Sequence, residues 1–103
     1  MGPTIVRTIA AASPSRKVAH RIIACLCVGV ADGIENGALS TRDAMKDLFT
    51  DENYQEVKRH RMNKSLKACF EAGMKLDGLG KDDVVKSVIA MRDLARQVLR
   101  TAK

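Results

Sequence analysis

The sequence predicts an all-α protein, a small single-domain bundle of four to five helices around a central apolar helix. Three observations support this prediction. Apolar residues recur at helical spacing through most of the chain, and no stretch alternates in the manner of a strand. The longest apolar run, residues 22–31, contains no charge. At 103 residues the chain is long enough to bury one core and too short for a second.

The first fifteen residues are expected to form an N-terminal segment of their own. Ile5, Val6 and Ile9 give it enough apolar surface for one or two helical turns, and Pro14 would end such a helix. The segment is therefore expected either to pack loosely or to form a short helix. The bundle domain is predicted to comprise residues 16–103.

The central helix is predicted to cover residues 16–36. Ser13 or Ser15 is expected to cap its start, and Gly37 is well placed to end it in the left-handed conformation. Its apolar face is broad: it comprises Ala19, Ile22, Ile23, Leu26, Val30 and Ile34. Because Val18, Cys25 and Val28 extend the apolar surface further, we expect neighbouring helices to cover this helix on most sides.

The rest of the chain shows three further helical patterns. Ser40 is a capping hydroxyl with an acid three residues later, which predicts a short helix ending near residue 49. Thr50 offers the next cap, and a helical pattern continues over residues 51–76 with a break near Met62. After a glycine turn at residues 78–80, a last helix is predicted from residue 81 to the end.

Residues that carry out chemistry are few and badly spaced for catalysis. His20 and His60 are far apart, and neither has a neighbouring carboxylate in sequence to orient it as a base. Cys25 and Cys27 would point away from each other on a helix, so they cannot hold one metal ion together. With Cys69 they are expected to be buried free thiols. We therefore predict no enzyme activity, no catalytic residues, no cofactor and no metal.

The basic N-terminal region followed by an apolar run resembles a secretory signal peptide in outline. Cleavage after the small residues Gly29 and Ala31 would remove the best core helix of a small chain, so we expect the segment to be retained. The run is too short to span a bilayer. A cytoplasmic protein without membrane contact is expected.

The formal net charge is +6, and the basic residues form two clusters. We predict these clusters as the partner-binding residues: Lys58, Arg59, Arg61, Lys64 and Lys67 in one, and Arg92, Arg96 and Arg100 at four-residue spacing in the other. They suit an acidic protein face or nucleic-acid phosphates. The alternative is that they are solvated helix faces, partly neutralised by Glu56, Glu71 and Asp93. One Tyr and two Phe are too few for a base-stacking platform.

Two motifs resemble a known family. GIENGALS at residues 33–40, followed by Asp43-Ala44 and Leu48-Phe49, is the stronger one, and AGMKLDGL at residues 72–79 is the weaker. Together they resemble a family of small bacterial helical proteins of uncharacterised function, over about residues 22–99. The resemblance implies an all-α fold and supplies no catalytic residues. Stand-alone proteins of this kind look like immunity proteins that neutralise secreted toxins.

The first functional hypothesis is a non-enzymatic helical protein that binds another protein, as an immunity or accessory factor of a bacterial toxin system. Its partner would present an acidic surface to the two basic clusters. The alternative is a basic helical module that binds nucleic acid through residues 58–67 and 92–103. The last helix carries apolar residues on two faces, which leaves a homodimer open.

Overall fold

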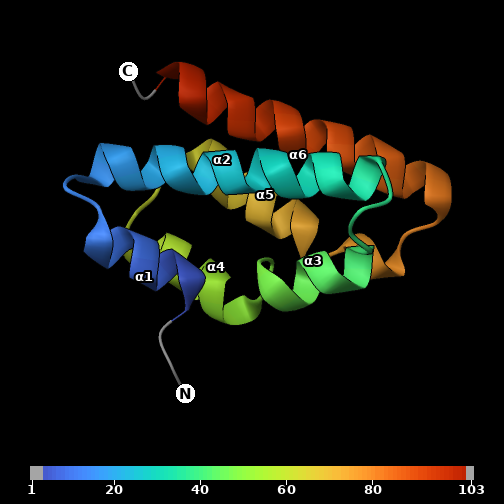
Figure 1. Ribbon diagram of the computed structural model, residues 1–103, viewed down its shortest axis with the longest axis horizontal. Coiled ribbons are helices and arrows are strands. Elements are labelled where there is room, and N and C mark those ends of the chain that lie inside the picture. Colours follow the sequence, from blue (N-terminus) through green and yellow to red (C-terminus); the bar gives the residue numbers. More distant parts are fainter. Residues whose placement is uncertain (1–3, 102–103) are drawn as a thin grey trace.

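The computed structural model describes residues 4–101, and within them the chain forms six α-helices, one 3-10 turn and no strand (Figure 1). The elements are α1 (Ile5–Ala12), α2 (Arg16–Glu35), α3 (Thr41–Asp47), α4 (Asp51–Arg59), α5 (Lys64–Gly73), η1 (Leu76–Gly78) and α6 (Lys81–Thr101). The predicted all-α single domain is confirmed. The predicted helix boundaries agree with the observed ones to within about three residues.

The two longest helices, α2 and α6, lie antiparallel, and α5 packs against both of them (Figure 1). The short helices α1, α3 and α4 line the other edge of the bundle. The molecule is flattened, with principal extents of 38 × 34 × 21 Å. Because α2 contacts α1, α3, α5 and α6, the chain is organised around it as predicted.

The helix ends follow from the capping residues that the sequence indicates. Ser15, Ser40 and Thr50 each accept a hydrogen bond from the backbone N–H three residues further on, at the starts of α2, α3 and α4. Each bond satisfies a donor that the helix itself leaves unpaired. Gly37 follows α2 with a φ of +83°, the left-handed conformation that glycine adopts without steric cost.

The core is aliphatic, with two aromatic rings at its centre. Phe49 and Phe70 meet edge to face with their centroids 5.3 Å apart, and Phe49 lies directly over Gly73. The buried residues around them come from every α-helix: Val6, Ile23, Ala24, Cys27, Ala31, Ala44, Leu48, Val57, Met62, Leu66, Cys69, Leu76, Val88, Met91, Ala95 and Val98. Helix α5 is the most enclosed, because Leu66, Cys69 and Phe70 are all fully buried along it.

Helix α2 is less covered than its apolar sequence predicts. Ile22 is 42% exposed and Cys25 is exposed as well, so one side of α2 faces solvent. The prediction of three buried thiols is therefore wrong for Cys25 and confirmed for Cys27 and Cys69. The reason is geometric: the other helices of this short chain pack on the inner and lateral sides of α2, and the described chain places none over its outer side.

The N-terminal segment contains a short helix that is attached to the bundle at one buried polar contact. Val6 is fully buried, and its backbone N–H donates to Oδ1 of Asn53 at 3.1 Å. Nδ2 of Asn53 donates to the Leu48 carbonyl at 2.9 Å. Asn53 is 3% exposed and thus joins α1, α4 and the end of α3. No helix within residues 4–101 is both long and apolar enough to cross a bilayer.

Candidate functional site

The two predicted basic clusters meet at one end of the bundle. Helices α5 and α6 run antiparallel, and the Ser65 hydroxyl at the start of α5 donates to Oε1 of Gln97 at 3.4 Å. This contact sets Lys64 beside the last turns of α6, where Arg96 and Arg100 are exposed. The turn between α4 and α5, which contains Arg61, lies at the same end.

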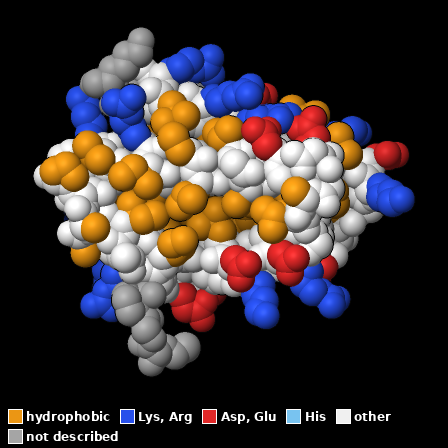
Figure 2. All heavy atoms as spheres, viewed as in Figure 1, with side chains coloured by type: hydrophobic (Ala, Val, Ile, Leu, Met, Phe, Trp, Pro, Cys, Tyr) orange, Lys and Arg blue, Asp and Glu red, His pale blue; other side chains and the backbone are white. Residues whose placement is uncertain are grey.

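The start of α2 adds a third basic segment to this end. The Arg16 guanidinium donates a hydrogen bond to the Arg61 carbonyl, which fixes α2 beside the α4–α5 turn. We call this surface the basic end; its members are Arg16, Lys17, Arg21, Arg59, Arg61, Lys64, Arg96 and Arg100, all exposed. In Figure 2, Lys and Arg side chains gather at the upper left, where α2 begins and α6 ends, whereas most Asp and Glu lie further right.

The sequence prediction did not include Arg16, Lys17 and Arg21 in the binding surface. These residues are separated from the α4–α5 turn by about forty positions, so spacing along the chain gives no sign that they meet. One signal was present: the first acid of the sequence is Asp32, so the whole first half of α2 is basic.

Arg61 occupies an unusual backbone conformation at the centre of the basic end. Its φ is +49°, which makes it the one non-glycine residue with positive φ in the described part of the chain. Next to it, Arg59 contacts Glu56 at 3.5 Å while its side chain stays 69% exposed. Lys58 turns away from this end, because its Nζ lies 4.7 Å from the centre of the Tyr54 ring.

Arg92 and Lys67 are placed differently from the other predicted residues. Arg92 contacts Asp32 and Glu35 of α2, each at 2.5 Å, and its side chain is only 17% exposed. The hydrogen bond to Asp32 raises the pKa of Arg92 further above its usual value. Its charge therefore joins α6 to α2 and interrupts the predicted arginine stripe, while Lys67 is half-buried on α5.

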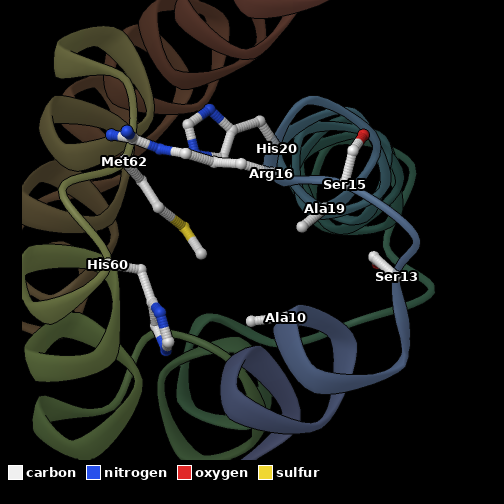
Figure 3. A pocket seen from close by; sticks show the side chains of 8 residues that line it. All are labelled: Ala10, Ser13, Ser15, Arg16, Ala19, His20, His60 and Met62. Carbon is white, nitrogen blue, oxygen red and sulfur yellow. The ribbon is translucent and has the colours of Figure 1, made fainter.

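A cavity of about 250 Å³ lies beside the basic end, between α1, α2 and the α4–α5 turn. Figure 3 shows the side chains that line it: Ala10, Ser13, Ser15, Arg16, Ala19, His20, His60 and Met62. The two imidazoles come from different walls, and the Met62 side chain lies between them. They do not form a pair that could share a proton, and the arrangement contains no activated nucleophile.

His20 is the most buried of the polar groups in this cavity. It is 9% exposed, and its Nε2 has no hydrogen-bond partner among residues 4–101. Burial lowers the pKa of His20, and the charge of Arg16 lowers it further. The imidazole is therefore neutral at physiological pH. His60 instead has its Nε2 3.2 Å from Oε2 of Glu56, four residues earlier in the sequence, so the expectation that neither histidine has a neighbouring carboxylate is wrong for His60.

The buried cysteines do not suggest a chemical site. The thiols of Cys27 and Cys69 are neighbours in the core, and the hydrogen bond between them, together with burial, raises the pKa of Cys27 well above its usual value. A thiol that stays protonated is a poor nucleophile and a poor metal ligand. Within residues 4–101, His, Cys, Asp and Glu side chains form no group of three that could hold a metal ion.

Comparison with curated proteins and with solved structures gives no significant match. One family, described as a protein of unknown function (DUF3969), matches residues 15–103. The match starts at the capping residue of α2, so α1 lies outside it. The resemblance to an uncharacterised family is thereby confirmed: the chain belongs to the DUF3969 family of proteins of unknown function.

Proposed function

We propose that this protein acts without catalysis, by docking its basic end against an acidic face of another protein. The toxin of a bacterial toxin–immunity pair is the kind of partner that we propose, with this chain as the neutralising factor. The observation that carries the proposal is the convergence of three basic segments, from α2, the α4–α5 turn and α6, on one end of the bundle.

This convergence concentrates charge that is spread along the sequence. Like charges repel when they are brought together, so such a surface costs free energy in the isolated protein. An acidic partner would relieve the repulsion and would be attracted over a distance, which increases the association rate. Asp82 and Asp83 lie in the first turn of α6, at the opposite end of that helix from Arg96 and Arg100. Glu56 does contact Arg59, at 3.5 Å, but the exposed bases of this end outnumber it.

The backbone of Arg61 supports a role for its side chain. A residue with a Cβ in the left-handed conformation costs about 1–2 kcal/mol relative to the right-handed one. Glycine or asparagine is the usual residue at such a helix end. An arginine at this position keeps a charge at the centre of the basic end despite that cost.

A protein partner fits the surface better than nucleic acid does. The one tyrosine donates its hydroxyl to Glu71 at 2.5 Å and has its ring against Lys58, while both phenylalanines are in the core. The basic end therefore offers no aromatic ring for base stacking. Arg92 is paired with acids, so the arginines of α6 do not form a continuous track for a phosphate backbone.

The proposal can be tested with the purified product of the neighbouring gene and isothermal titration calorimetry. We expect Arg61→Glu combined with Lys64→Glu to weaken binding about a hundredfold, because two attractive contacts become repulsive. The matched control is Lys81→Glu with Lys86→Glu, which makes the same change in net charge at the opposite end of α6. It should bind within a few-fold of the wild type.

A second variant separates binding from folding. Arg61→Gly removes a charge and also relieves the left-handed backbone, so its melting temperature should rise while its affinity falls.

A random DNA duplex is the second probe. If only the duplex binds, with affinity that falls steeply as salt rises, the nucleic-acid alternative is correct. If neither probe binds at low salt, the proposed docking role is wrong.

A further inference from the structure

The outer side of α2 carries a narrow apolar stripe that the rest of the described chain leaves uncovered. Val18, Ile22, Cys25 and Gly29 are spaced four, three and four residues apart, which places them within about 60° on the helix. Ile22, Cys25 and Gly29 are exposed and Val18 is half-buried. In Figure 2 separate hydrophobic side chains are exposed along α2, and a longer apolar band lies below it, between α2 and the short helices α1 and α3. We call these four residues the outer stripe.

The spacing of the outer stripe is that of a coiled-coil seam, and the stripe is complementary to itself when reversed. In an antiparallel pair of α2 helices, Val18 lies opposite Gly29 of the second copy and Ile22 lies opposite Cys25. Each large side chain then meets a small one. A Cβ built on Gly29 meets no atom within 4 Å, so the space there is open to a side chain from outside.

The charges on α2 favour the same arrangement. Its first turn contains Arg16 and Lys17 and no acid, and its last turn contains Glu35 and no base. Both ends therefore oppose the helix macrodipole, which favours acids at the start and bases at the end. An antiparallel copy brings the opposite sign to each end. In the register defined above, Lys17 of one copy lies near Asp32 of the other.

Asp32 and Glu35 are only partly neutralised within the chain, so Asp32 can still attract Lys17 of a second copy. They share a single cation, Arg92, and both carboxylate side chains remain 47% exposed. The cluster of Asp32, Glu35 and Arg92 therefore carries a net negative charge.

We propose that α2 is the interface of a two-fold symmetric homodimer, in which the outer stripes of two copies pack antiparallel. Between the two copies, the pairs Val18–Gly29 and Ile22–Cys25 form the centre of the interface. A Lys17–Asp32 ion pair lies at each of its two ends. This interface shares Lys17 with the basic end, but it does not depend on the proposed docking role.

Sedimentation velocity of the full chain over a concentration series, under reducing conditions, tests the proposal. We expect the wild type to change from the mass of one chain to that of two as concentration increases. Gly29→Gln should increase the dimer dissociation constant about tenfold or more, because its side chain would fill the space that Val18 of the other copy occupies. Folding should not suffer, since the position is open and glutamine favours the helix.

Two pairs of variants locate the interface. Ile22 and Ile89 are equally exposed, at 42% and 43%, but Ile89 lies on α6. Ile22→Asp should therefore give a monomer, whereas Ile89→Asp should still dimerise. Lys17→Glu should weaken the dimer several-fold by facing Asp32, whereas Lys86→Glu, with the same change in charge, should not. The proposal is wrong if the wild type stays monomeric at every concentration. It is also wrong if Ile89→Asp dissociates the dimer while Gly29→Gln does not.

Discussion

Helices α5 and α2 each contain a glycine within an apolar sequence, but the two glycines are surrounded very differently. A Cβ added to Gly73 on α5 would lie 2.3 Å from Cγ of Phe49, whereas one added to Gly29 on α2 would meet nothing within 4 Å. At Gly73 the absence of a side chain lets an aromatic ring lie against the helix backbone. At Gly29 the glycine lowers helix stability without any packing benefit inside the chain.

An apolar helix sequence therefore indicates that the helix is buried, but it does not indicate whether the same chain or another molecule buries it. The less apolar α5 is enclosed on nearly all sides, while α2, with the longest apolar run, lies at the surface on one side. For α5 the covering elements belong to the same chain. For α2 we infer that a second copy of the chain supplies the missing cover.

Alanine substitutions at the two glycines should have opposite effects on stability. Gly73→Ala should lower the free energy of unfolding by about 2–3 kcal/mol, because the new methyl group displaces the Phe49 ring from its contact with Phe70. Gly29→Ala should raise it by about 1 kcal/mol through helix propensity alone. Urea unfolding at low protein concentration, where the chain is a monomer, measures both. If Gly73→Ala were neutral, the packing of Phe49 on α5 would be looser than described.

A smaller effect is expected at the polar contact that holds α1 against the bundle. Asn53→Ala removes both side-chain hydrogen bonds and leaves the buried Val6 N–H and Leu48 carbonyl without their partner, which should cost about 1–3 kcal/mol. The loss should appear first as faster amide hydrogen exchange in α1, while α5 stays protected because packing holds it. Asn36→Ala, which loses only an exposed hydrogen bond to Ala38, is the control. Equal loss of protection in α1 and α5 would contradict this difference.

The helices and their ends could be predicted from the sequence because their causes are local. A cap such as Ser15 or Thr50 acts on an N–H three residues away, and Gly37 acts at its own position. The helical pattern over residues 51–76, with its break near Met62, could be predicted for the same reason.

The candidate site could be predicted only in part, because its causes are long-range. The contact between Arg16 and Arg61 spans 45 positions, and that between Arg92 and Asp32 spans 60. A charge pattern read along the chain therefore included Arg92, whose charge is already paired, and omitted Arg16. Asn53 was missed because a buried asparagine in a polar helix has no signature in the sequence.

The smallest expected effect concerns His20, on the inner side of α2. Because the folded protein lowers the pKa of His20, the unfolded chain binds a proton at this residue more readily, near the ordinary pKa of about 6.5. The free energy of unfolding is therefore greatest at pH values above the unfolded pKa of His20. It decreases as the pH falls through that unfolded pKa towards the lower pKa of His20 in the folded protein. We expect the melting temperature to decrease between pH 7.5 and 5.5.

Replacing the imidazole should weaken this pH dependence. In His20→Gln the melting temperature should change less over the same pH range, whatever its value at pH 7.5, because the buried group no longer titrates. His60→Gln is the matched control, since His60 lines the same cavity but lies beside Glu56. If His20→Gln kept the full pH dependence, the imidazole would be protonated as readily in the folded protein as in the unfolded chain. The inner side of α2 would then be as open to water as its outer stripe, and the distinction between its two sides would not hold.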